Sequence, residues 1–238
     1  MDIVSLFCGC GGMDLGLIKA GHHIIWANDI DQDSTDTYSK NIGSKIKHVV
    51  TKDLKDISIG EVPDCDVVIG GFPCQGFSVV NKFRKVEDER NEMYLELLRI
   101  IKGKKPKYFI AENVPGICSL GGYESNEDKK KGEGIVMKAI LAEMRGCGYR
   151  VSWKKLNAAD YGVPQSRQRI IFLGTREDID RTLQHPLQTH SKTGYANLIN
   201  KDIKKWKTLK DAIYDLPEPN SDHDMQMHVH NNHKVKIN

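Results

Sequence analysis

One cysteine in this sequence stands where a reactive thiol could be held rigidly. Residues 66–69 form an apolar run rich in β-branched side chains, which predicts a buried strand. The next residues read Gly-Gly-Phe-Pro-Cys-Gln-Gly, so Cys74 follows a proline that fixes one backbone torsion, and Gly76 allows a turn. In open α/β sheets, ligands bind at this carboxyl edge. A small buried cysteine is the alternative, and the rest of the chain decides between the two.

Other polar groups follow predicted strands in the same way. Glu112 comes directly after the apolar run at 107–111. Arg167 and Arg169 have period-two spacing, which would place both on one face of an extended segment. Two surface arginines on an edge strand is the alternative for this pair. Glu112 is therefore a second reactive group, besides Cys74, at the carboxyl end of a predicted strand.

A glycine-rich turn at residues 8–12 separates a predicted strand at 3–7 from a predicted helix at 13–20. This arrangement lets the backbone approach a ligand at a helix N-terminus, although many such turns bind nothing. Asp29 ends the next apolar run, about twenty residues later, where nucleotide-binding sheets hold a ribose. The pairing with the glycine turn favours this function over a solvated turn.

The remaining elements suggest an α/β fold. Hydrophobic patterns predict further strands at 24–27, 47–50, 149–157 and 169–174, and helices at 34–41, 92–101, 134–146 and 207–214. The last two strands have no helix between them, which indicates an antiparallel hairpin at one edge of the sheet. Residues 79–91 are predicted to be a functional loop, and residues 124–133, charged and poor in apolar side chains, a mobile surface loop.

Composition excludes several classes of protein. The chain has 238 residues, 39% of them hydrophobic and 28% charged, as in an ordinary globular protein. It contains no run of eighteen apolar residues, so no membrane span is expected. The N-terminus lacks the features of a signal peptide, and the six cysteines fit neither a disulfide framework nor paired metal-binding motifs. We therefore expect free thiols in a cytoplasmic protein. A net charge of +3 does not by itself indicate nucleic acid.

Four motifs in order resemble the DNA (cytosine-5) methyltransferase family. The sequence has Phe-Cys-Gly-Cys-Gly at 7–11, Pro-Cys-Gln at 73–75, Glu-Asn-Val at 112–114 and Gln-Ser-Arg-Gln-Arg at 165–169. The resemblance covers residues 2 to about 217. It implies a Rossmann-like S-adenosylmethionine-dependent methyltransferase fold, with a mostly parallel sheet and an antiparallel edge hairpin.

The resemblance also assigns roles to individual residues. Cys74 would add to cytosine C6, Glu112 would meet the charge at N3, Arg169 would hold O2, and Arg167 would support the pocket or a phosphate. S-adenosylmethionine would be the methyl donor, no metal would be needed, and the cofactor would contact Phe7, Gly9, Gly11, Asp29, Asp53 and Pro73. DNA would be contacted by Gln75, Ser78, Lys82, Arg84 and Gln165.

The implied function is methylation of a flipped-out cytosine in duplex DNA, as part of a bacterial restriction-modification system near the nucleoid. The family usually has Glu where this chain has Asp29, and it continues into a target-recognition domain and a Gly-Asn-rich closing segment. We expect residues 1–175 to be the catalytic and cofactor-binding domain, and 176–238 to lead toward a recognition region that is truncated or supplied by a second polypeptide. An RNA substrate and an inactive fragment are the alternatives.

Overall fold

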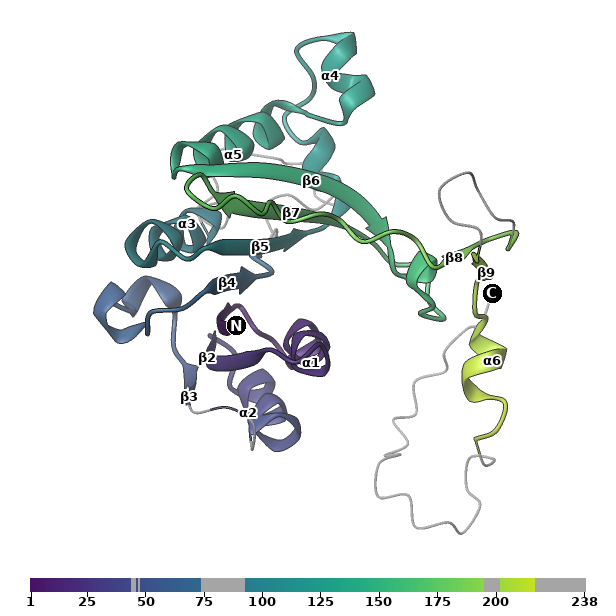
Figure 1. Ribbon diagram of the computed structural model, residues 1–238, viewed down its shortest axis with the longest axis horizontal. Coiled ribbons are helices and arrows are strands. Elements are labelled where there is room, and N and C mark those ends of the chain that lie inside the picture. Colours follow the sequence, from purple (N-terminus) through teal and green to yellow (C-terminus); the bar gives the residue numbers. More distant parts are fainter. Residues whose placement is uncertain (44–45, 47, 74–92, 195–201, 217–238) are drawn as a thin grey trace.

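A seven-stranded sheet forms the centre of the molecule (Figure 1). The structure is a computed structural model that describes residues 1–43, 46, 48–73, 93–194 and 202–216. In sheet order, the strands are β3 (His48–Thr51), β2 (His23–Asp29), β1 (Asp2–Leu6), β4 (Val67–Gly70), β5 (Tyr108–Asn113), β7 (Gln168–Arg176) and β6 (Tyr149–Asn157).

The direction of the strands changes only at β7, which runs opposite to all the others in this sheet. The five strands from β3 to β5 are parallel, whereas β7 runs antiparallel to both β5 and β6. The predicted α/β fold and the antiparallel hairpin at one edge are therefore confirmed. Because β1, β2, β3, β4 and β5 are parallel, their carboxyl ends lie along one edge of the sheet, and β7 begins at that same edge.

Helices cover both faces of the sheet (Figure 1). On one face, α1 (Gly12–Lys19) and α2 (Gln32–Asn41) enclose a cluster that includes Ile3 and Tyr38. On the other face, α3 (Met93–Lys104) and α5 (Ile135–Gly146) pack on a larger cluster. Val4 and Leu6 belong to this second cluster, so β1 alternates between the two cores as a central strand must.

The expectation of a surface loop at 124–133 is wrong, because the segment contains the short helix α4 (Asn126–Lys131). The Ser125 side chain accepts a hydrogen bond from the Asp128 N–H at 3.1 Å, and Gly132 ends the helix with a φ of 71°. Glu127 and Lys131 form an ion pair at 2.7 Å. Local capping and charge pairing stabilise this helix without an apolar face, so periodicity could not predict it.

A C-terminal arm extends beyond β7 (Figure 1). It contains two short parallel strands, β8 (His190–Ser191) and β9 (Lys204–Lys205), followed by α6 (Leu209–Ile213). The helix expected at 207–214 is present with narrower bounds. Short 3-10 turns follow three strands of the sheet. The turns η2 (Leu54–Asp56) and η3 (Ile59–Glu61) follow β3, η6 (Pro115–Ser119) follows β5, and η7 (Ala158–Tyr161) follows β6. No helix in the described ranges is both long enough and apolar enough to cross a membrane.

Candidate active site

The turn between β1 and α1 has an unusual backbone. Phe7, Gly9 and Gly11 have φ angles of 53°, 52° and 83°. Phe7 pays a steric penalty for this conformation that the two glycines avoid. Such backbone is characteristic of binding sites and persists where surrounding contacts enforce it. Here the Cys8 N–H donates to the Asn28 carbonyl at 2.9 Å, which fixes the turn to β2.

The two glycines of this turn have different surroundings. A Cβ atom on Gly11 would lie 2.4 Å from Ile42 Cδ1 and within 2.8 Å of the Tyr38 ring, so Gly11 lets the turn pack on α2. A Cβ atom on Gly9 would meet nothing within 4 Å. Only Gly9 therefore has the open space that close approach of a ligand requires.

Asp29 connects this turn to the end of β2. Its Oδ2 accepts a hydrogen bond from the Gly9 N–H at 2.8 Å, and its Oδ1 accepts one from the Asp31 N–H at 3.0 Å. The sequence prediction that Asp29 and the glycine turn belong to one site is consistent with this contact. A carboxylate beside an open glycine turn, at the edge of a parallel sheet, fits the ribose end of a nucleotide-like methyl donor.

A buried carboxylate beneath the turn was missed by the sequence analysis. Asp14 is 1% exposed, and it accepts hydrogen bonds from Ser5 Oγ at 2.8 Å and from Tyr38 Oη at 2.6 Å. Burial raises the pKa of Asp14 above its ordinary value, although the two donors oppose that shift. The only sequence signal was a carboxylate within the otherwise apolar spacing of α1. This network ties β1, α1 and α2 together behind the glycine turn.

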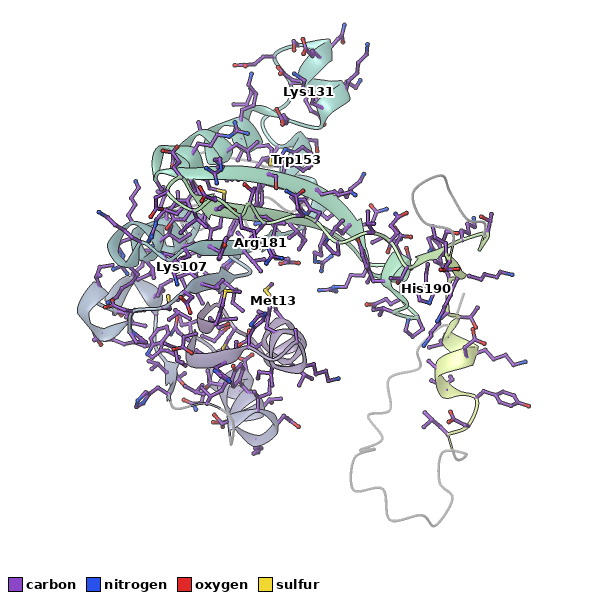
Figure 2. All side chains as sticks on the ribbon, in the orientation of Figure 1. Met13, Lys107, Lys131, Trp153, Arg181 and His190 are labelled. Carbon is purple, nitrogen blue, oxygen red and sulfur yellow. The ribbon has the colours of Figure 1, made fainter. Side chains whose placement is uncertain are left out.

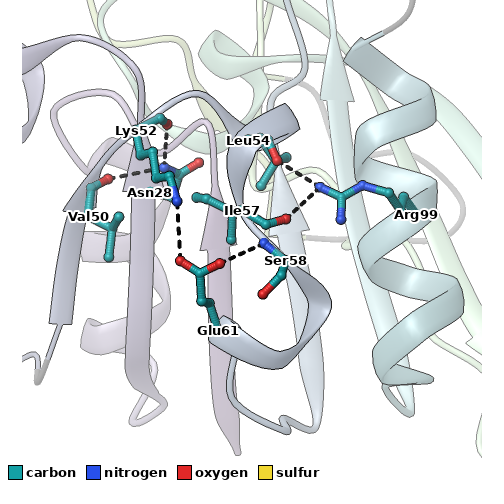
Figure 3. A network of polar contacts seen from close by, with 8 residues as sticks. All are labelled: Asn28, Val50, Lys52, Leu54, Ile57, Ser58, Glu61 and Arg99. Atoms are coloured by element: carbon teal, nitrogen blue, oxygen red, sulfur yellow. Dashed lines mark hydrogen bonds and ion pairs between the residues drawn. The ribbon is translucent and has the colours of Figure 1, made fainter.

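A second polar network surrounds the turn that carries Asp53 (Figure 3). The Asn28 amide donates to the carbonyls of Val50 and Lys52, at 3.1 and 2.8 Å. Lys52 pairs with Glu61, whose other oxygen accepts the Ser58 N–H. From α3, Arg99 donates to the carbonyls of Leu54 and Ile57, at 2.7 and 3.0 Å.

Asp53 lies within this polar network, two residues after the end of β3. Its Oδ1 accepts the Lys55 N–H at 2.9 Å and so caps η2. Because Asp29 pairs in register with Thr51, the two carboxylates follow neighbouring strand ends. The predicted cofactor residues Asp29 and Asp53 therefore share one edge of the sheet, and Arg99 is an additional residue that holds this part of it in place.

The ends of β4 and β5 are joined by a side-chain amide. Asn113 Nδ2 donates to the Phe72 carbonyl at 3.3 Å, while Asn113 Oδ1 accepts the Val114 N–H at 2.7 Å. Pro73 is exposed immediately after Phe72. Asn113 thus fixes the last described turn before Cys74 against the strand that carries Glu112. The predicted residues Cys74, Gln75, Ser78, Lys82 and Arg84 lie outside the described residues.

Glu112 and Arg169 form an ion pair across β5 and β7. The distance from Arg169 Nε to Glu112 Oε1 is 2.6 Å, and the two side chains are 25% and 24% exposed. A Cβ atom on Gly71 would lie 3.1 Å from Glu112 Oε2, so the turn after β4 approaches the same carboxylate closely. The structure therefore brings two predicted site residues together beside the segment that leads to Cys74.

The other two residues of this predicted group are at the surface. Arg167 and Gln165 are exposed, and their assigned roles stay predictions. The Arg167 backbone is nevertheless fixed, because its N–H donates to Asn157 Oδ1 at 2.9 Å. Asn157 is a second residue that the sequence analysis missed.

The described cysteines are all free, as expected for those positions. Burial raises the pKa of the Cys8, Cys118 and Cys147 thiols, and that of Cys65 to about 12. At neutral pH these four remain thiols, which are poor nucleophiles. No group of three or more His, Cys, Asp or Glu side chains suited to a metal ion occurs within the described residues.

Comparison with known proteins supports the family resemblance of the four sequence motifs. The profile of the C-5 cytosine-specific DNA methylase family matches residues 1–237. The type II methyltransferase M.NgoFVII of Neisseria gonorrhoeae is 38% identical over 94% of this chain and 55% of its own length. M.AquIA of Picosynechococcus is 34% identical over 99% of this chain and 96% of its own length.

Solved structures show the same likeness. A DNA modification methyltransferase encoded within a prophage of E. coli has a TM-score of 0.66 at 28% identity, over 92% of this chain and 56% of that one. The methyltransferase EhMeth of Entamoeba histolytica, 24% identical with a TM-score of 0.59, covers 79% of this chain and 56% of its own and supports the fold alone. This chain spans about half the length of M.NgoFVII. The chain belongs to the C-5 cytosine-specific DNA methylase family.

Proposed function

We propose that this chain carries the catalytic part of a DNA (cytosine-5-)-methyltransferase of a bacterial type II system. The supporting observation is the pairing of Glu112 with Arg169, 2.6 Å apart, beside the turn that leads into Cys74. Two relatives named as type II methyltransferases match almost the whole chain. In this proposal the enzyme acts in the bacterial cytoplasm, on DNA of the nucleoid.

The chemistry divides one difficult substitution into easier steps. A stacked cytosine is inaccessible, so the base is first flipped out of the duplex. The Cys74 thiolate then forms a bond to C6, which makes C5 nucleophilic. S-adenosylmethionine, when bound, supplies an electrophilic methyl group for C5. The demethylated donor would leave as S-adenosylhomocysteine. Transfer of the C5 proton to a base, such as water, then allows the bond between C6 and Cys74 to break, which releases Cys74 as the thiolate.

Glu112 and Arg169 would position the base during these steps. Glu112, in its protonated form, would donate a hydrogen bond to N3, where negative charge develops as the thiolate adds, and the guanidinium group of Arg169 would face O2. The base would enter where the two side chains now meet, so their ion pair must separate or be shared with the ring. Both side chains are about one-quarter exposed, which leaves them accessible to a base.

The methyl donor would lie along the ends of β1, β2 and β3. The open face of Gly9 suits its methionine end, Asp29 its ribose and Asp53 its adenine amino group. Phe7, Gly11 and Pro73 complete this predicted pocket. The division into a catalytic part at 1–175 and a recognition-linked part at 176–238 is likewise a proposal.

The longer relatives contain segments that the match to this chain does not cover. We propose that DNA recognition needs such segments, whether they continue on this chain or come from a second polypeptide.

The test is transfer of a labelled methyl group from S-adenosylmethionine to duplex DNA, with tRNA as a competing acceptor. The protein is assayed alone and with the product of any adjacent reading frame. We expect labelled 5-methylcytosine in DNA, and none from a Cys74→Ala variant. Preferential labelling of tRNA would overturn the DNA assignment, and a fully active Cys74→Ala variant would overturn the mechanism.

A further inference from the structure

We infer that Asp160 is a positioning residue that couples the C-terminal arm to Arg167 and Arg169. The arm is defined here as residues 186–194 and 202–216. Asp160 lies in η7, at the start of the loop that joins β6 to β7. The inference rests on the proposed function, because it assigns Asp160 a part in presenting the two arginines to DNA.

Asp160 contacts the arm through three separate acceptor atoms. Its Oδ1 accepts a hydrogen bond from Trp206 Nε1 at 2.9 Å, and its Oδ2 accepts one from Gln188 Nε2 at 2.9 Å. Its main-chain carbonyl accepts the Thr189 N–H at 3.0 Å. Trp206 follows β9 and Gln188 precedes β8, so one carboxylate holds both strands of the arm. The charged carboxylate makes the bonds from Trp206 and Gln188 stronger than bonds to a neutral acceptor would be.

The same loop is closed onto the arginine strand at its other end. Asn157 Oδ1 accepts the N–H groups of Arg167 and Ala159, at 2.9 and 3.3 Å. The Ala158 N–H also donates to the Arg167 carbonyl at 2.9 Å. Arg169 follows two residues later and pairs with Glu112. Asp160 and the Arg167 backbone are thus held by one short, internally bonded segment.

The contact between loop and arm is tightly packed as well as hydrogen-bonded. A Cβ atom on Gly162, whose φ is +87°, would lie 2.7 Å from His190 Cε1. His190 is only 9% exposed, and Figure 2 places it where the arm meets the end of the β6–β7 hairpin. The Tyr161 hydroxyl donates to the Pro186 carbonyl at 3.1 Å. Without free space between them, a displacement of the arm must displace the loop.

The loop that contains Asp160 connects two parts of the molecule. One end is the arm, which contains α6. The other end is the start of β7, where Arg169 is predicted to hold the base and Arg167 to support the pocket or a phosphate. The Asp160 carboxylate therefore aligns the arm with Arg167 and Arg169, and it makes no contribution to the cofactor end of the sheet.

The test compares three variants of the full chain. Asp160→Asn replaces one of the two carboxylate acceptors with a donor, whereas Trp206→Phe removes the indole N–H and reduces the size of the ring. Asp211→Asn is the matched control, because Asp211 caps α6 within the arm by accepting from Thr208. The first readout is amide hydrogen exchange at Arg167 and Arg169, which needs neither DNA nor activity.

We expect Asp160→Asn and Trp206→Phe each to accelerate exchange at Arg167 by about tenfold, the effect of roughly 1.4 kcal/mol. The double variant should be no faster than the faster single variant, since both substitutions act on the one carboxylate that joins the loop to the arm. Asp211→Asn should leave this exchange unchanged. Exchange at the wild-type rate in both single variants, or additive effects in the double variant, would overturn the coupling.

The second readout separates a positioning role from general stabilisation. With duplex DNA, kcat/KM should fall about tenfold in Asp160→Asn, while the Kd for S-adenosylmethionine stays within about twofold of the wild-type value. An equal loss of cofactor affinity would show a merely structural role. If the wild-type chain transfers no methyl group either alone or with the product of an adjacent reading frame, the proposed function fails, and hydrogen exchange still decides the coupling.

Discussion

Glycine in the β1–α1 turn can serve two purposes, close packing on α2 at Gly11 and open space for a ligand at Gly9, and alanine substitutions distinguish them. Gly9 and Gly11 both have positive φ angles, of 52° and 83°. An added methyl group at Gly11 would overlap Ile42 and Tyr38 of the α2 region, at 2.4 to 2.8 Å, whereas at Gly9 it would meet no atom within 4 Å. The two substitutions therefore carry the same backbone penalty and differ in packing.

The expected magnitudes follow from these contacts. A left-handed backbone costs an alanine about 1–2 kcal/mol relative to glycine, and this term applies to both variants. Overpacking adds about 1–3 kcal/mol at Gly11 only. We thus expect Gly11→Ala to lower the free energy of unfolding by about 2–5 kcal/mol and Gly9→Ala by about 1–2 kcal/mol.

Urea unfolding followed by circular dichroism measures this difference, and titration calorimetry adds the affinity for S-adenosylmethionine. Gly9→Ala should weaken cofactor binding about tenfold or more, since its methyl group enters the open face of the turn. Equal stability losses in the two variants would refute the packing explanation of Gly11. Unchanged cofactor affinity in Gly9→Ala would refute the placement of the methyl donor beside that face.

Four further predictions concern side chains. Tyr38→Phe leaves a buried carboxylate without one donor and should cost about 1–3 kcal/mol in urea unfolding. Because burial raises the pKa of Asp14, the native state keeps this proton after the unfolded chain has lost it. The stability of the wild type relative to Asp14→Asn should therefore fall as pH rises above about 4, and a rise would contradict that sign. Arg99→Met removes the donor to two carbonyls and should raise the KM for S-adenosylmethionine, whereas the exposed control Lys102→Met should not. Glu112→Gln should lower kcat about 10²- to 10⁴-fold in the methyl-transfer assay and leave the Kd for S-adenosylmethionine unchanged.

Local patterns were sufficient to predict most of the sheet. Runs of β-branched residues marked the central strands, and two strands without an intervening helix correctly indicated the antiparallel edge. Polar residues just after those strands could be assigned to one edge, because parallel strands end together. The proximity of Asp29 and the glycine turn follows from that rule, and that of Glu112 and Arg169 follows from the antiparallel β7, which begins at the same edge.

Contacts between distant side chains had no comparable signal. Asp14 and Tyr38 are 24 residues apart, and Arg99 reaches a turn more than 40 residues earlier in the chain. Each is an ordinary polar residue on its own helix, and only tertiary packing brings it to its partner. The two-residue strands β8 and β9 are also too short for a periodic pattern, so the arm and its contact with Asp160 emerged only from the structure.

Trapping of a covalent protein–DNA adduct tests the central claim most directly. Duplex DNA of mixed sequence that contains 5-fluorocytosine is incubated with the protein and S-adenosylmethionine. After methylation of such a base, C5 carries no proton to lose, so the bond from Cys74 to C6 cannot break. We predict a complex that survives denaturation, requires S-adenosylmethionine and is absent with Cys74→Ala. Methylation of ordinary DNA without any such complex, or the same complex from Cys74→Ala, would contradict the account.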